Sequence, residues 1–111
     1  MSQPFTDLRV WQQSIDLVEE VYRATEPFPR HELYGLTSQL RRAAVSLPSN
    51  IAEGKGLQTD RECCSFLYRA RGSLMEIQTQ AIIANRLHYI TEQNMNILLR
   101  RCEQIGRGPA D

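Results

Sequence analysis

Apolar residues recur at three- and four-residue spacing along most of the chain, a period typical of amphipathic helices. Glu26-Pro27-Phe28-Pro29 must end the first such pattern, because proline lacks an amide N–H and biases the preceding residue away from helical geometry. Thr59-Asp60-Arg61-Glu62 has the form of a capping box and predicts the start of a further helix. The pattern predicts helices at about 7–25, 31–54, 59–86 and 91–106.

Short connections between successive helices favour antiparallel neighbours, so we expect an all-α, antiparallel up-down-up-down four-helix bundle. A chain of 111 residues suits one such domain, spanning 1–111, and leaves little room for a second. Pro48 falls inside the second predicted helix, where it removes the hydrogen bond to the carbonyl of Ala44. The helix is expected either to bend there or to divide into two shorter helices near Ser46.

The composition limits the classes of partner and compartment. Thirteen basic and thirteen acidic residues give a formal net charge of zero, so any nucleic-acid site must be a local patch. The N-terminus has no secretory pattern, and no apolar stretch approaches the length needed to cross a bilayer. The three cysteines are an odd number, with Cys63 and Cys64 adjacent and Cys102 distant, which is not a disulfide framework. A reducing cytoplasm is the expected location.

Polar residues interrupt the apolar stripes of the second and third helices at regular spacing. A buried polar group without a partner costs about 1–3 kcal/mol, so a fold keeps one only where a neighbour satisfies it. One interpretation is a polar seam that fixes the register of the two helices, and the other is a site for a ligand or partner. The residues concerned are Gln39, Ser46, Asn50, Glu53, Ser73 and Glu76.

Catalytic and metal chemistry find little support in the sequence. Glu53 and Glu76 could form an acid–base pair if burial separated their protonation, but neither a nucleophile nor a histidine base accompanies them. Glu-x-x-His pairs, which di-iron bundles use, are absent, and His31 and His88 are expected to be exposed near helix ends. The cysteines lack zinc-binding spacing and are interpreted as small core residues. We therefore predict no catalytic residue, no cofactor and no metal.

Arginines gather in pairs along the second, third and fourth predicted helices. Guanidinium groups bind phosphates as well as carboxylates, so these residues are candidate nucleic-acid contacts, although solvated helix faces and ion pairs are the plainer interpretation. The residues are Arg41, Arg42, Arg69, Arg71, Arg100 and Arg101.

The first helix carries apolar residues on more than one stripe. Because a helix in a four-helix monomer buries only one face, the excess predicts burial against another subunit. Head-to-tail contacts that close produce a ring. The candidate interface residues are Val10, Trp11, Leu17 and Val21.

Four segments resemble a known family, the four-helix-bundle proteins first noticed as open reading frames in intervening sequences of bacterial 23S ribosomal RNA. They are Phe5–Gln12, Phe28–Ala44, Asn50–Gly54 and Gly72–Glu76, and the resemblance spans nearly the whole chain. Related bundles are accessory proteins of diversity-generating retroelements, which form pentameric barrels whose basic surface engages a reverse transcriptase and nucleic acid. The chain departs from that pattern in its neutral charge and in Leu57, which stands where a basic residue often follows the glycine turn.

The resemblance implies a homopentamer, while most members of the family have no assigned activity. The favoured hypothesis is a non-enzymatic cytoplasmic bundle that self-assembles and offers a surface to a protein or RNA partner. The alternative is an RNA- or DNA-binding accessory protein that uses the surface arginines.

Overall fold

The computed structural model describes residues 4–56 and 60–107, with side chains described for 4–56 and 64–107. These residues form four α-helices and two short 3-10 helices, which confirms the predicted all-α bundle. The predicted capping box at residues 59–62 lies outside the residues whose side chains are described. In chain order the elements are η1 (Phe5–Asp7), α1 (Arg9–Thr25), η2 (Arg30–Glu32), α2 (Leu36–Gly56), α3 (Asp60–Arg86) and α4 (Glu92–Gly106).

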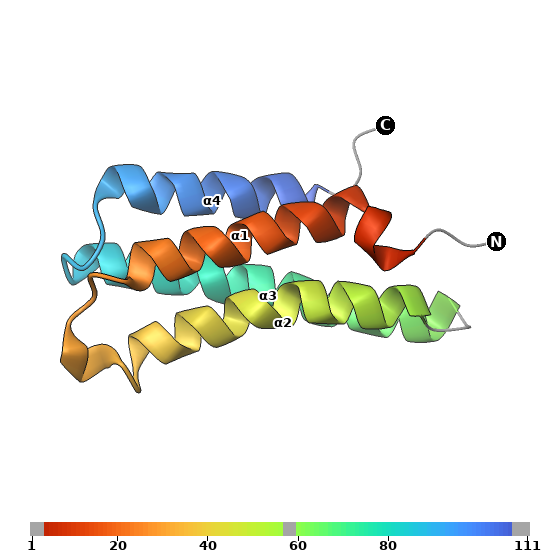
Figure 1. Cartoon of the computed structure of the whole chain (residues 1–111), viewed down its shortest axis with the longest axis horizontal. Coiled ribbons are helices and arrows are strands. Elements are labelled where there is room, and N and C mark those ends of the chain that lie inside the picture. Colours follow the sequence, from red (N-terminus) through yellow and green to blue (C-terminus); the bar gives the residue numbers. More distant parts are fainter. Residues whose placement is uncertain (1–3, 57–59, 108–111) are drawn as a thin grey trace.

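Successive helices run in opposite directions along one elongated bundle (Figure 1). The connection through η2 and the turn between α3 and α4 lie at one end, and both ends of the chain lie at the other. Among the described residues, α1 packs on α2 and α4, and α3 packs on the same two helices. Helices α1 and α3 therefore lie across the bundle from each other, and so do α2 and α4.

Helix boundaries follow from local hydrogen bonding. Thr91 caps α4, because its hydroxyl accepts a hydrogen bond from the Asn94 N–H at 3.1 Å. His88, with φ of 66°, ends α3 in the left-handed conformation that favours helix termination. Two predicted starts were too early: residues 5–7 and 30–32 form separate 3-10 turns, and α1 and α2 begin only at Arg9 and Leu36.

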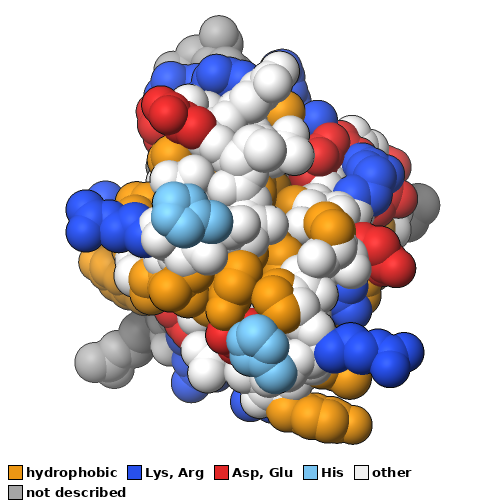
Figure 2. All heavy atoms as spheres, turned by 90° about the vertical axis from the view of Figure 1, so that its left-hand side faces the viewer, with side chains coloured by type: hydrophobic (Ala, Val, Ile, Leu, Met, Phe, Trp, Pro, Cys, Tyr) orange, Lys and Arg blue, Asp and Glu red, His pale blue; other side chains and the backbone are white. Residues whose placement is uncertain are grey.

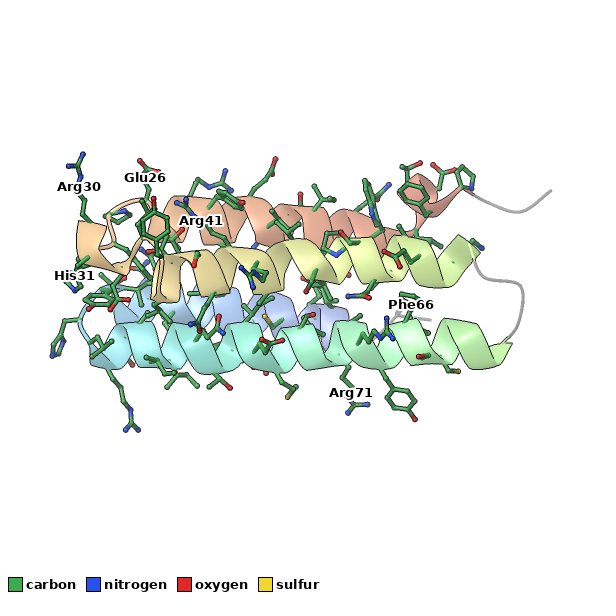
Figure 3. The ribbon with its side chains drawn as sticks, turned by 90° about the horizontal axis from the view of Figure 1, so that it is seen from below. Glu26, Arg30, His31, Arg41, Phe66 and Arg71 are labelled. Atoms are coloured by element: carbon green, nitrogen blue, oxygen red, sulfur yellow. The ribbon has the colours of Figure 1, made fainter. Side chains whose placement is uncertain are left out.

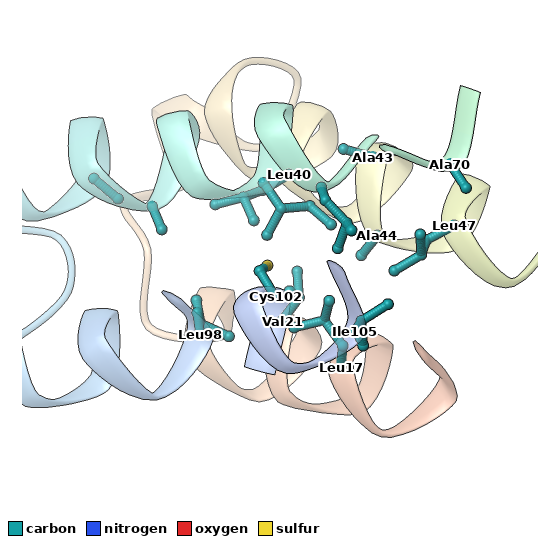
Figure 4. Packing of buried hydrophobic residues seen from close by; sticks show 14 of the residues in the cluster. Leu17, Val21, Leu40, Ala43, Ala44, Leu47, Ala70, Leu98, Cys102 and Ile105 are labelled. Atoms are coloured by element: carbon teal, nitrogen blue, oxygen red, sulfur yellow. The ribbon is translucent and has the colours of Figure 1, made fainter. Parts of the chain in front are cut away.

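A single cluster of buried apolar side chains fills the bundle interior and draws on all four α-helices (Figure 4). Removing such side chains from water is the main stabilising term, at about 1.5–3 kcal/mol for each large aliphatic residue. Small residues complement the large ones where helices approach closely. The largest fully buried aliphatic side chains are Leu17, Leu40, Leu47, Ile77 and Leu98.

Helix α2 is continuous through Pro48, so the alternative of two shorter helices is wrong. Side-chain donors surround the proline and bond to carbonyls of the preceding turn. Asn50 Nδ2 donates to the Ser46 carbonyl at 2.8 Å, and the Ser49 hydroxyl donates to the Val45 carbonyl at 3.0 Å. Neither bond reaches the Ala44 carbonyl, which loses its regular donor at Pro48. The two side chains instead bond back to their own helix, as short polar residues within helices commonly do.

The cysteines differ in their environments. Cys102 is buried in the core, and this burial raises the pKa of its thiol to about 12. Cys64 is exposed, which corrects the interpretation of the cysteines as core residues, because its position on α3 faces away from the other helices. The Cys63 side chain lies outside the described residues. Within the described part of the chain, no helix is both long and apolar enough to span a membrane.

Candidate functional site

Ser46 of α2 and Ser73 of α3 form a polar contact inside the bundle. Their Oγ atoms are 2.6 Å apart. Each hydroxyl also lies within hydrogen-bond distance of a carbonyl of its own helix, Ser46 at 2.8 Å from Ala43 and Ser73 at 3.2 Å from Arg69. Since a hydroxyl has one proton, one serine donates to the other while the second donates to its helix. The contact ties α2 to α3.

The other four residues of the expected polar seam do not join this contact. Gln39, Glu53 and Glu76 are exposed, and Asn50 bonds to its own helix. The spacing placed them on the correct edges of α2 and α3, but only the narrow strip around Ser46 and Ser73 is covered by the neighbouring helix. Glu53 and Glu76 are consequently surface carboxylates rather than a buried acid–base pair.

A double-mutant cycle tests the serine contact. Ser46→Ala and Ser73→Ala are each expected to lower the free energy of unfolding by about 1 kcal/mol, and the double variant by less than the sum, because the two changes remove one shared hydrogen bond. Denaturant unfolding measures this. Glu53→Ala serves as the matched control and should change stability by less than about 0.5 kcal/mol. Additive serine effects would contradict the contact.

Arg41 joins α2 to the end of α1 (Figure 3). Its Nε donates to the Thr25 hydroxyl at 2.8 Å, and its guanidinium carbon lies 4.6 Å from the centre of the Tyr22 ring. The Glu26 carboxylate is 3.9 Å away. With three partners within the chain, Arg41 is a structural clamp between α2 and α1.

The other candidate arginines are spread around the bundle. Arg101 of α4 pairs with Glu20 of α1 at 3.4 Å, and Arg69 of α3 stacks on Phe66 at 4.7 Å. Arg42, Arg71 and Arg100 are exposed. Because they come from α2, α3 and α4, the six arginines do not form one basic face. Two of the sequence pairs stay together, because Arg41 and Arg42 line one surface groove and Arg100 and Arg101 line a depression on α4.

The apolar excess of α1 is largely satisfied within the chain. Leu17 and Val21 are fully buried in the core, which corrects their assignment as interface residues. Val10 and Trp11 are half-buried against the same core, and Trp11 also makes an edge-on contact with Phe5 at 5.5 Å. Helix α1 packs on both α2 and α4, so two of its flanks are covered. The prediction had assumed that a helix of the bundle buries only one face.

A surface groove of about 500 Å³ runs between α1 and α2, and we call it the α1–α2 groove. Exposed apolar side chains and two arginines line it. Thr37 lies at its buried edge, only 4 % exposed, and its hydroxyl has no hydrogen-bond partner among the residues that the structure describes. The lining residues are Tyr22, Leu33, Thr37, Ser38, Arg41, Arg42, Val45 and Ser46.

Exposed apolar residues also follow the outer side of α3. Tyr68, Met75 and Ile82 are spaced by seven residues, which places them on one face of the helix. Tyr68 is 74 % exposed and Met75 is 53 % exposed. Arg71 lies between them and points away from the bundle (Figure 3). We call this set of four residues the α3 face.

Comparison with known proteins finds a family match that covers nearly the whole chain. A family model described as 23S rRNA-intervening sequence protein matches residues 6–108. The chain belongs to this family. No curated protein matches it in sequence. The resemblance carried by segments such as Phe5–Gln12 and Asn50–Gly54 is therefore confirmed.

In this member of the 23S rRNA-intervening sequence family, a polar cluster joins η2 to the turn after α3. Both segments lie at the end of the bundle that faces the viewer in Figure 2. The Glu32 carboxylate accepts hydrogen bonds from the Leu36 N–H at 3.0 Å and from the Tyr89 hydroxyl at 3.0 Å. These two bonds, the first more than the second, lower the pKa of Glu32. The carboxylate raises the pKa of Tyr89 in turn. A side chain at Gly35 would meet Glu32 Oε1 at 2.7 Å, so glycine keeps this cap in place.

The lowered pKa of Glu32 predicts a pH dependence. A carboxyl with a lower pKa in the folded state stabilises the fold above its unfolded pKa, and this contribution is lost as the pH falls through the folded value. Glu32→Gln should therefore reduce the loss of stability below about pH 4.5. Thermal melts across the acidic range measure this, with Glu53→Gln as the exposed control. Equal acid sensitivity in wild type and Glu32→Gln would refute the assignment.

The sequence interpretation missed the α3 face and the α1–α2 groove. The signal for the α3 face was present, because Tyr68, Met75 and Ile82 recur every seven residues outside the buried stripe of α3. The apolar residues of α3, like those of α1, occupy more than one stripe of the helix. The groove had no comparable signal, since Tyr22 and Val45 come from different helices and meet only in the fold.

Proposed function

We propose that this chain is a non-enzymatic helical-bundle protein of the cytoplasm that self-assembles and presents a surface to a macromolecular partner. The observation that carries the proposal is the exposed apolar α3 face. A regular row of large apolar side chains on a bundle surface is typical of an interface, because monomers seldom leave such rows in water. The family resemblance supports a ring of five subunits as the assembled form.

The character of the exposed polar residues supports a binding role over catalysis. Glu53 and Glu76 lie on the surface, whereas paired catalytic carboxylates are distinguished by burial of one of them. Cys64 is exposed as a free thiol, in keeping with a reducing compartment. A closed ring would repeat each surface feature once per subunit, which suits binding of an extended partner through several weak contacts.

Sedimentation velocity tests the proposal. Met75→Asp places a charge in the α3 face and is expected to convert the assembly to monomers, because a desolvated carboxylate without a partner strongly opposes association. Gln93→Asp, an exposed change on α4, is the matched control and should leave the assembly intact. An unchanged oligomer in Met75→Asp would place the interface elsewhere.

Nucleic-acid binding is the second candidate, and one observation favours it. Near the end of α4, three arginines line a shallow depression of about 560 Å³. They are Arg100, Arg101 and Arg107, and Arg101 is partly neutralised by Glu20. Three cations beside Glu103 make a small field, so we expect weak binding at most.

Fluorescence anisotropy with a structured RNA at low salt measures such binding. If α4 binds phosphates, log affinity should fall with log salt with a slope of about −0.9 for each phosphate contact, and Arg100→Ala should reduce that slope by about one. Arg86→Ala, an exposed change at the end of α3, is the control. Absence of association at micromolar protein would remove this candidate and leave the assembly proposal untouched.

A further inference from the structure

The α1–α2 groove combines an apolar wall with positive charge. Tyr22, Leu33 and Val45 line it, and each of these side chains is nearly half exposed. Arg41 and Arg42 are the charged residues of its described lining, and no carboxylate stands among them. The groove is therefore complementary to a ligand that carries both anionic and apolar groups.

The two arginines of the groove are held differently. Arg41 is fixed at the side of α1, because its Nε bonds to the Thr25 hydroxyl at 2.8 Å and its guanidinium lies over the Tyr22 ring. Its contact with Glu26 is long, at 3.9 Å, and the Glu26 side chain is 84 % exposed, so this pair neutralises the cation only in part. Arg42 is exposed and makes no ion pair within the described part of the chain. One oriented guanidinium and one free guanidinium are thus available to an anion.

The shape of the groove favours a segment of a larger partner over a small molecule. Sites for small molecules bury about 70–90 % of the ligand surface, whereas the walls of this groove are themselves open to solvent. Its lining extends along α2 from Thr37 to Ser46, which is about 14 Å at 1.5 Å per residue. That length accommodates about four extended residues at about 3.3 Å each. The rest of a partner protein would cover the side of such a segment that faces away from the groove.

The lining favours carboxylates over the phosphates of a nucleic acid. A nucleic acid is bound by a row of cations along its backbone, and single strands also need open aromatic faces on which bases stack. The described lining has only two cations, and the Arg41 guanidinium already covers a face of Tyr22, the aromatic ring of the groove. An acidic residue beside a large apolar one fits better. Its carboxylate can pair with a guanidinium fork while the apolar side chain packs on Leu33 or Val45.

We propose that the α1–α2 groove binds an extended segment of a partner protein in which acidic residues stand next to large apolar ones. A carboxylate of the segment pairs with Arg42, and a neighbouring apolar side chain packs against Leu33 and Val45. This inference rests on the proposed role of the bundle as a surface for a macromolecular partner. It names that surface and the chemistry of the partner.

Fluorescence anisotropy with labelled peptides tests the chemistry of the partner. The probe repeats two glutamates followed by two leucines, so that both kinds of side chain lie on each face of the extended peptide. A peptide with lysines in place of the glutamates should bind at least about tenfold more weakly, because like charges oppose association. A peptide with serines in place of the leucines should also bind about tenfold more weakly, because the apolar contact is lost.

Variants of the chain test the location of the site. Arg42→Glu reverses an exposed charge and is expected to weaken binding of the acidic peptide by about tenfold or more. Arg86→Glu makes the same change of charge at the end of α3 and should leave the affinity unchanged. Circular dichroism checks that each variant is folded. If Arg42→Glu fails to fold, Arg42→Gln, which removes the charge without reversing it, takes its place.

The outcomes separate this inference from the proposal beneath it. Failure of the acidic peptide to bind an assembled wild type, equal binding of either altered peptide, or an unchanged affinity in Arg42→Glu would overturn the groove assignment alone. A structured RNA that binds and loses affinity in Arg42→Glu, while the acidic peptide does not bind, would overturn it in favour of phosphates. A wild type that is monomeric in sedimentation velocity would overturn the proposed self-assembly, whether or not the peptide binds.

Discussion

Replacing Leu17 by alanine is expected to lower the free energy of unfolding by about 2–5 kcal/mol. The side chain is 0 % exposed and lies in the centre of the core beside Val21 (Figure 4). Its removal loses the transfer free energy of the deleted atoms and leaves a cavity that packed helices refill only in part. Chemical denaturation, followed by circular dichroism at a fixed protein concentration, measures the change.

Leu87→Ala is the matched control, because Leu87 is exposed beyond the end of α3 and its truncation should cost less than about 0.5 kcal/mol. The comparison also decides between two roles for Leu17. An interface residue would alter the concentration dependence of unfolding, whereas a core residue destabilises the bundle at every concentration. A loss of stability as small as that of the control would contradict the core assignment.

Arg41→Ala should have the second largest effect, a loss of about 1.5–3 kcal/mol. The change removes the hydrogen bond that the charged guanidinium donates to Thr25, and a hydrogen bond from a charged group contributes about 1.5–3 kcal/mol. It also removes the contact over the Tyr22 ring. The ion pair to Glu26 adds little, because its carboxylate is exposed. Thermal or denaturant unfolding gives the loss directly.

Arg42 provides an unusually close control for this experiment. It is adjacent in sequence and carries the same charge, but its side chain is exposed, so Arg42→Ala should leave stability within about 0.5 kcal/mol of the wild type. If the two substitutions had equal effects on unfolding, Arg41 would be one more surface cation. The contacts of Arg41 would then contribute no more than a surface charge to the packing of α2 against α1.

Helix number and order could be predicted because each rests on local pattern. The apolar period, the prolines after Glu26 and the glycines at the end of α2 act within a few residues, so their consequences do not depend on the rest of the fold. The starts of α1 and α2 were less predictable. At η2 the chain could continue as a helix, and only the contact of Glu32 with the Leu36 N–H and with Tyr89, more than fifty residues away, sets where α2 begins.

The candidate sites could be predicted only where both partners faced inward. Ser46 and Ser73 meet because each lies on the side of its helix that covers the other. Glu53 follows Ser46 by seven residues and lies only about 20° from it around the axis of α2, yet it is exposed. Arg41 was assigned from its charge alone, while its role depends on Thr25, which sequence spacing does not connect to it. Pairwise geometry between helices is the information that the sequence pattern lacked.

The central claim is that the chain assembles through exposed apolar surfaces, and the mass of the purified protein in solution tests it most directly. Multi-angle light scattering across a wide range of concentration should give one closed species several times the monomer mass of 12.8 kDa. Five subunits are expected from the family resemblance. A single species at 12.8 kDa throughout that range would contradict the account.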